Sequence, residues 1–326
     1  MRNFFAVVER ELKSYFISPL ACVILGFFLL ATGLFFYVVV NSFERMSMMS
    51  AMQAQQYGQM PPAMNVNMMA VRPLLHNIGI IAMFLLPGLT MRLLAEEKRQ
   101  GTMELLQTSP LTNWQITLGK FTGAWLFYLA MLAATGVLIS LLFIFGNPEL
   151  KPLLAGYLGL FLVGGCFIAL GLLFSAFTEN QIIAFVSALA VNLILLSMGW
   201  LSSFTGPALS SILTHLSPID HFDDFTKGIL DSKHAVFYVS FIFALLFLTY
   251  LILESARWRG FQGRRVKLGV PMTLAEVAKS LGEKNEAVLV KAQAFGLSSF
   301  DQTISHPQEL VELAHQFGYD AEVKGR

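Results

Sequence analysis

Runs without any charged side chain constrain this chain more than any other feature of its sequence. Six intervals lack Asp, Glu, Lys and Arg, and each is at least 19 residues long: 14–43, 73–91, 121–148, 152–178, 180–219 and 234–253. A helix needs about 20 apolar residues to cross a bilayer. Ser, Gly and Pro break up the second half of the fifth interval, which therefore counts as one span. The sequence predicts six spans, near 20–40, 77–91, 121–145, 153–177, 181–200 and 234–253.

Composition and the placement of basic residues support the same class. The chain is 55% hydrophobic and 13% charged, which is typical of an all-α membrane protein. With the N-terminus inside, the inner segments carry twelve Lys and Arg and the outer segments five. This bias predicts that both termini are cytoplasmic. The net charge of +1 comes with no basic stripe, so no nucleic-acid partner is indicated.

The two ends of the chain differ from the spans. In residues 1–19 the apolar side chains share one helical face and most charges lie opposite, which predicts an interfacial helix ahead of the first span. From Leu268 the chain becomes hydrophilic, and two capped helical patterns predict a small cytoplasmic helical domain. We expect a six-span membrane domain at 1–258, a basic linker at 259–267 and the tail domain at 268–326.

A charged connector, RLLAEEKRQGTMELLQTSPLTNWQITLGK (92–120), separates the second and third spans. It combines good helix formers, a break at Gly101, and a second short helix that begins at Thr102. One interpretation is a plain solvated turn. A plain turn is short and polar, as TEN at 178–180 is, whereas the connector has the pattern of an organised helical surface. We therefore interpret it as a docking element.

The connector resembles that of ABC transporter permeases of the type-2 exporter class. The shared features are an acidic pair, Gly-Thr-x-Glu-Leu-Leu, a Ser/Pro turn and a Gly-Lys that enters the third span. RELKSYFISPLA and FTENQIIA are similar to the family's interfacial helix and its turn between spans four and five. The segment LSPIDHFDDFTKGILDSKHAVFYVS is similar to the gliding-motility-associated branch. The resemblance covers residues 1–258.

The resemblance implies that the connector binds a cytoplasmic ABC ATPase. The implied coupling residues are Glu96, Glu97, Lys98, Arg99, Gly101, Thr102, Met103, Glu104, Leu105 and Leu106, with Glu179 as a second contact. The sequence has no G-x-x-x-x-G-K-[ST] motif, so we expect ATP and Mg²⁺ in the partner and neither catalysis nor a bound cofactor in this chain. A second permease copy, or a related permease, would complete a twofold channel in the bacterial inner membrane.

Two segments on the predicted outer side leave alternatives open. The residues after the fifth span include His221, Phe222, Asp223 and Asp224, which we interpret as an outer gate. A divalent-metal site and a solvated acidic loop are the alternatives. The first outer loop is rich in Met, and thioethers suit Cu(I). Its weak candidate ligands are Met46, Met49, Met64 and Met68, and the alternative is an adaptable apolar surface.

The tail has a resemblance of its own. The segment from MTLAEVAKSLG to FGYDAEV is similar to the small N-terminal module of bacterial translation initiation factor two, which suggests a docking appendage. The spans carry no ionisable relay, which argues against ion-coupled transport. We expect a permease that couples a separate ATPase to export or mechanical work. The alternatives are a non-transporting anchor of a motility or envelope machine with an envelope partner, and a copper-handling subunit.

Overall fold

The computed structural model describes two compact units, Met1–Ile252 and Leu253–Arg326. The residues it describes are 2–57, 65–103, 106, 111–145, 148–261, 264–270, 272–281, 285–293, 303–304, 307–316 and 319–325. The expected linker at 259–267 stays a prediction, and the first strand of the tail begins inside it, at Arg264.

The first unit is built from helices. They are α1 (Arg2–Ile17), α2 (Pro19–Gln56), the π-helical segment η1 (Asn67–Val71), α3 (Arg72–Thr90), α4 (Ala95–Arg99), α6 (Asn113–Phe145), α7 (Leu150–Phe177), α8 (Gln181–Ser202), α9 (Pro207–Leu216), α10 (Pro218–Thr226) and α11 (Ser232–Phe261). Six of those described are long and apolar enough to cross a membrane: α2, α3, α6, α7, α8 and α11. For this unit, the prediction of an all-α membrane domain with six spans is confirmed.

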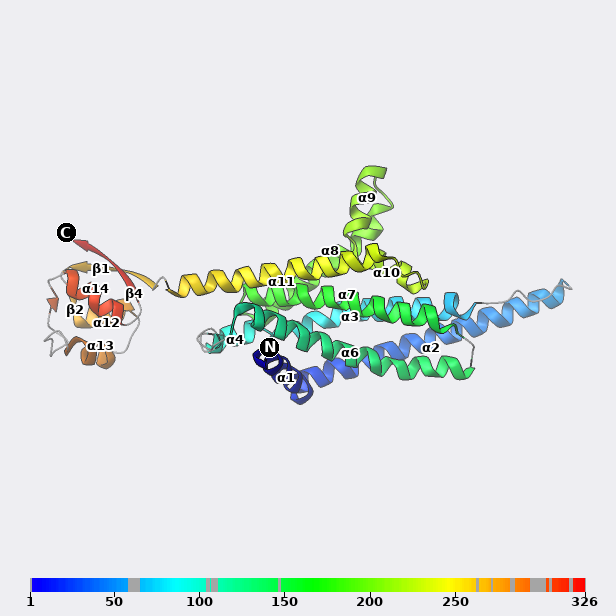
Figure 1. Cartoon of the computed structure of the whole chain (residues 1–326), viewed down its shortest axis with the longest axis horizontal. Coiled ribbons are helices and arrows are strands. Elements are labelled where there is room, and N and C mark those ends of the chain that lie inside the picture. Colours follow the sequence, from blue (N-terminus) through cyan, green and yellow to red (C-terminus); the bar gives the residue numbers. More distant parts are fainter. Residues whose placement is uncertain are drawn as a thin grey trace. The chain divides into compact units, whose positions relative to one another are not determined.

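The long helices α3 and α7 form the centre of this unit. Their apolar segments are 67% and 72% buried, against 17% for those of both α2 and α8. Helix α7 packs against α3, α6, α8 and α10. Figure 1 shows the long helices running side by side, with α9 standing out from them. The apolar faces that α2 and α8 leave exposed are of the kind that lipid or another membrane helix covers.

Helices α2 and α6 extend into segments that the sequence analysis assigned to the first outer loop and the connector. The first span was expected to end near Val40, but α2 continues to Gln56 through a segment that we assigned to a loop. This segment is rich in Met, Ala and Gln, which are good helix formers, so its polarity did not end the helix. Helix α6 begins at Asn113 and therefore includes the last part of the connector.

The predicted interfacial helix is present as α1, but its apolar face is divided. Val8 and Tyr15 are buried, whereas Phe5 and Phe16 are 63% and 59% exposed. The buried part packs against α6. One edge of the apolar face therefore meets the protein, and the interfacial placement of the helix stays a prediction.

The second unit, the tail, contains strands as well as the predicted helices. Its helices are α12 (Leu274–Leu281), α13 (Asn285–Ala292) and α14 (Pro307–Gln316). Strand β1 (Arg264–Val270) pairs in parallel with β4 (Tyr319–Gly325), and β2 (Met272–Thr273) pairs antiparallel with β3 (Thr303–Ile304). We expected helices alone. The β1–β4 pair joins residues 264 and 319 at one end of its register, a long-range contact that local patterns do not reveal.

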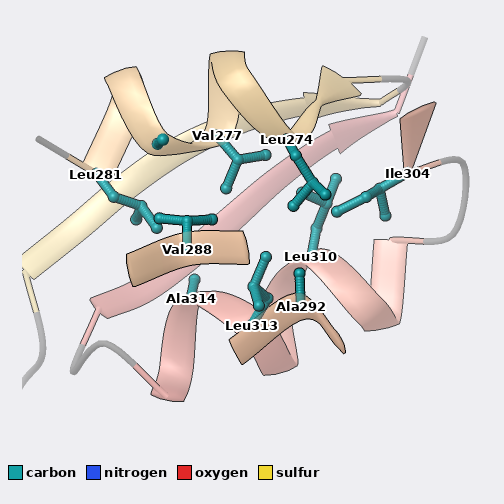
Figure 2. Packing of buried hydrophobic residues seen from close by; sticks show 10 residues of the cluster. Leu274, Val277, Leu281, Val288, Ala292, Ile304, Leu310, Leu313 and Ala314 are labelled. Carbon is teal, nitrogen blue, oxygen red and sulfur yellow. The ribbon is translucent and has the colours of Figure 1, made fainter. Parts of the chain in front are cut away.

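The predicted Thr cap of the first tail helix is present. Thr273 Oγ1 accepts from Glu276 N at 3.4 Å, and Glu276 Oε2 accepts from Thr273 N at 2.9 Å, which is a reciprocal capping box. Figure 2 shows Leu274 and Val277 of α12 facing the other helices across a small apolar core. Its other buried members are Ala278, Leu281, Val288, Ala292, Ile304, Leu310, Leu313 and Ala314.

Candidate functional site

The connector leaves α3 through a turn that α7 holds in place. Ser175 Oγ of α7 accepts from Leu94 N at 3.0 Å and from Ala95 N at 2.9 Å. The same hydroxyl donates to Met91 O at 2.9 Å. These bonds satisfy backbone groups at the start of α4, where a short helix has no partners of its own. After α4 the chain turns at Gly101, whose φ of 70° favours glycine.

Four charged side chains form what we call the connector cluster: Arg10 and Glu11 of α1, Glu97 of α4, and Lys120 of α6. Lys120 Nζ lies 3.0 Å from Glu11 Oε1 and 2.9 Å from Glu97 Oε1. Arg10 Nη2 lies 2.9 Å and 2.8 Å from the same two oxygens. The cluster therefore joins α1, the connector helix α4 and the long apolar helix α6 through alternating charges.

Burial makes this cluster more than a surface ion pair. The Lys120 side chain is 2% exposed, and those of Glu11 and Glu97 are 11% and 16% exposed. A buried charge is tolerated when opposite charges surround it, and removing its partner is costly. Burial alone would raise the pKa of Glu11, but Lys120 and Arg10 outweigh it and hold this pKa below its ordinary value of 4.5. Glu11 is therefore a carboxylate at neutral pH.

Close backbone approach brings α1 to the cluster. A Cβ on Gly119 of α6 would lie 2.6 Å from Val7 Cγ1, and one on Gly123 would lie 2.8 Å from Glu11 Cβ. Both separations are too short for a side chain at these positions. The two glycines thus let α1 lie directly on α6, which places Glu11 within reach of Lys120.

A cavity of about 400 Å³ lies beside the connector cluster. Its lining residues are Arg10, Glu11, Ser14, Tyr15, Arg92, Leu93, Glu96, Glu97, Gln100, Thr102 and Lys120. Within the described part of the chain, two buried polar atoms on this lining have no hydrogen-bond partner, namely Tyr15 Oη and Glu97 Oε2. Arg92 Nη1 donates to Ser18 Oγ at 2.6 Å, and its guanidinium lies 5.5 Å from the centre of the Tyr15 ring.

The predicted coupling residues fall into an exposed and an inward set. Arg99 and Gly101 are exposed and Glu96 is half-buried. Glu97 belongs to the connector cluster, and Lys98 Nζ donates to Ala176 O near the end of α7. The charge complementarity expected of Glu97 and Lys98 stays a prediction, but both side chains already have partners within the chain.

The remaining predicted contacts lie beyond α4. Met103 is 7% exposed and Leu106 is half-buried, while Thr102 Oγ1 donates to Glu97 O at 3.3 Å. Glu104 and Leu105 lie outside the described residues. Glu179 is exposed in the turn between α7 and α8, and α4 packs against the same two helices. The two predicted contact segments therefore belong to one end of the bundle.

A second charged group, which we call the α10 cluster, lies at the other end of α3. Asp223 Oδ1 accepts from Arg72 Nη2 at 2.6 Å and lies 3.1 Å from His76 Nε2. Asp223 Oδ2 lies 2.7 Å from Lys227 Nζ. Burial alone would raise the pKa of Asp223, but the bonds from Lys227 and Arg72 lower it to about 2. This carboxylate therefore ties α10 to α3 over the whole physiological pH range.

Two buried histidines complete the α10 cluster. His221 Nδ1 lies 2.6 Å from His234 Nδ1, His221 Nε2 lies 3.0 Å from His215 O, and His234 Nε2 lies 2.9 Å from Asp224 Oδ2. The Nδ1–Nδ1 contact is a hydrogen bond only when one ring donates and the other accepts. Protons on both Nδ1 atoms would place two N–H groups against each other.

The predicted gate residues are thus brought together, although Phe222 has a packing role. Its side chain is 2% exposed and lies against Gly79 of α3 and Gly159 of α7. His221, Asp223 and Asp224 hold α10 to α9, α3 and α11. Whether this segment opens as an outer gate stays a prediction.

The metal alternatives gain no geometric support in the described residues, where no group of three or more His, Cys, Asp and Glu is placed to hold an ion. Met46 and Met49 lie on α2 and Met68 lies in η1, and they are 47%, 70% and 65% exposed. Met64 lies outside the described residues.

Sequence analysis missed the partners that anchor the connector. Glu11 and Lys120 are 109 residues apart, and Ser175 is about 80 residues from the backbone it caps. One signal was present in the sequence. Glu11 lies four residues after Val7 and four before Tyr15, so it shares their side of α1. An acid among side chains that pack against protein requires a buried basic partner.

Comparison with known proteins identifies the family to which this architecture belongs. A family model described as ABC-2 family transporter protein matches residues 50–255. The chain belongs to this family. It is 32% identical over 171 residues to a protein named "Probable multidrug ABC transporter permease YbhR" in Escherichia coli K12, and equally to its counterpart in strain O157:H7. The match covers 52% of this chain and 45% of each relative, so the chain spans about half the length of these relatives.

Membership of the ABC-2 family defines the class of membrane protein to which the chain belongs. The ABC-2 chain is a multi-pass membrane protein of the permease type, and the six apolar helices provide its transmembrane part. The connector and the α10 cluster both fall inside the matched residues, whereas α1 and the tail fall outside them.

Proposed function

We propose that this chain is the membrane subunit of an ATP-driven exporter of the bacterial inner membrane, with both termini in the cytoplasm. A separate ATPase would bind the connector around α4 and the turn at Glu179, and it would supply ATP and Mg²⁺. Family membership supports this proposal, as does the absence from this sequence of a G-x-x-x-x-G-K-[ST] phosphate-binding motif.

The connector cluster is the single observation that carries the coupling proposal. Lys120 lies in a spanning helix, yet both of its acidic partners come from helices outside the bundle. A displacement of α4 by a bound partner would therefore act on α6 and α1 at once. Arg99 and Glu179 are exposed at this end of the bundle and remain available to such a partner.

The name of the E. coli relatives includes the word multidrug, and we propose export of small molecules on that basis. A second copy or a related permease would cover the apolar faces of α2 and α8 and complete the pathway. The gliding-motility branch and the initiation-factor-like tail remain proposals of the same kind. In that proposal the tail is a docking appendage.

Co-purification tests the ATPase contact. We would reverse two exposed charges, Arg99→Glu and Glu179→Lys, in the full chain and quantify associated proteins by mass spectrometry after mild solubilisation. Reversal at Glu97 is avoided because it would also break the connector cluster. Lys233→Glu, an exposed charge at the start of α11, is the matched control.

We expect the double variant to lose about tenfold or more of a nucleotide-binding subunit that the control retains, because complementary charges steer and hold protein partners. Equal recovery in both variants would remove these residues from the contact. No ATPase in any sample would overturn the proposed function.

A further inference from the structure

One face of α2 lines a cavity that the proposed coupling does not use. Val40, Phe43, Glu44, Ser47 and Met48 follow helical spacing and share this face. Val66, Ala70 of η1 and Leu142 of α6 form the opposite wall. The cavity has a volume of about 450 Å³, within the range of small-molecule sites. We call it the α2–η1 cavity.

The wall opposite α2 is held in place by polar contacts. Asn67 Nδ2 donates to Glu149 O at 3.2 Å, and Asn67 Oδ1 accepts from Glu149 N at 3.0 Å. Asn65 Oδ1 also accepts from the Asn67 and Met68 amides, at 2.9 and 3.2 Å. η1 is π-helical, a geometry that is uncommon and is found frequently at functional sites. These contacts fix the cavity wall to the segment before α7.

The chemistry of the lining is apolar with one exception. Phe43 and Met48 offer an aromatic ring and a polarisable thioether, and Ser47 offers a hydroxyl. Glu44 is the ionisable residue among the lining side chains, it is exposed, and within the described part of the chain its carboxylate has no ion pair or hydrogen bond. Arg45, the next residue along α2, is not part of the lining.

We propose that the α2–η1 cavity binds a lipophilic cation, a compound with one positive charge shielded by apolar groups. Glu44 supplies the countercharge, and an aromatic face with a thioether favours a weakly hydrated cation. The carboxylate would repel an anion, and it would add no electrostatic attraction to the binding of a neutral apolar compound. As an export substrate class this inference rests on the proposed function, whereas binding itself does not depend on it.

The assignment also gives the Met-rich segment a role without a metal. Met48 lies on the cavity face of α2, while Met46 and Met49 are not among the lining residues. Thioethers that surround Cu(I) would need to converge on one point, and the lining contains a single Met. Met48 therefore serves as an adaptable apolar wall.

Two ions of matched size and opposite charge provide the test. The purified full chain in lipid nanodiscs is equilibrated with tetraphenylphosphonium or tetraphenylborate, and free ligand is measured by dialysis. We expect saturable binding of the cation only. Glu44→Gln should weaken that binding by about tenfold or more, because it removes the countercharge. Asp231→Asn changes another solvent-accessible acid, which is outside the lining, and should leave the binding unchanged.

A steric variant separates the cavity from general surface charge. Ser47→Phe keeps Glu44 but fills the space beside it, and we expect the cation affinity to fall by about tenfold as well. Equal binding of the two ions, or unchanged affinity in Glu44→Gln, would overturn the site. Displacement of the cation by stoichiometric Cu(I) would also overturn it in favour of a metal.

The same samples distinguish this inference from the proposed function. Selective cation binding in a chain that recruits no ATPase supports the cation site and overturns the proposed exporter function. An ATPase that co-purifies equally with wild type and Glu44→Gln, without any saturable cation binding, overturns the site and supports the transporter.

Discussion

Opposite ends of α3 lead to two charged clusters that hold short helices to the bundle by different chemistry. In the connector cluster Lys120 and Arg10 share two carboxylates, those of Glu11 and Glu97. In the α10 cluster a carboxylate with fixed partners lies beside two histidines in direct contact. The difference indicates that ion pairs hold the connector end, whereas the α10 end also depends on imidazole rings, whose hydrogen bonds change with their protonation.

The largest expected effect is at Lys120. Glu11→Gln together with Glu97→Gln leaves this 2%-exposed ammonium without an anionic partner. We expect the free energy of unfolding to fall by about 3–5 kcal/mol, the usual cost of an uncompensated buried charge. The loss is measured as thermal stability of the purified chain in detergent.

Adding Lys120→Met to that pair gives the decisive control. The triple variant contains no stranded charge, so much of the lost stability should return even though the ion pairs are gone. If the triple variant is as unstable as the double, the cluster contributes through packing rather than charge, and the contrast with the α10 end fails.

The α10 end should lose stability as the pH falls, which is the second largest effect that we expect. Burial lowers the pKa of His221 from its ordinary 6.5, and repulsion from His234 and His215 adds to this, against opposing effects of the bond to His215 O and of Asp220. The unfolded chain therefore binds the proton at higher pH than the folded chain does. Stability at the α10 end is present above about pH 6.5 and is lost as the pH falls toward the folded pKa.

Hydrogen exchange measures this loss locally. Between pH 7.5 and 5.5, after correction for intrinsic rates, opening of α9 and α10 should increase by up to about tenfold per pH unit. Helix α1 should not respond, because the pKa of Glu11 lies below 4.5 and its contribution is lost only in stronger acid. His221→Gln does not titrate and should flatten the response. Equal opening of α1 and α10 would contradict the comparison.

The sequence predicted the spans well and the clusters poorly, for one physical reason. Charge-free intervals report directly on the bilayer, so the fifth span was expected at 181–200 and α8 is Gln181–Ser202. Asp223 and Arg72 are 151 residues apart, and nothing in the local pattern of either specifies the other. Helix α2 was cut short because polarity was taken to end a helix, whereas helix propensity carried it on.

The smallest expected effect tests whether burial, rather than charge itself, distinguishes the connector cluster. Glu9 and Lys13 lie on the same helix as Glu11 and form an ion pair at 2.6 Å, but their side chains are 67% and 69% exposed. Water screens such a pair, so Glu9→Ala should cost much less stability than Glu11→Ala does. The same thermal assay in detergent measures it, with Glu11→Ala as the matched variant one turn away. Equal costs for Glu9→Ala and Glu11→Ala would mean that the total charge of α1, and not the buried cluster, holds this helix. The connector cluster would then no longer support coupling between α4 and α6.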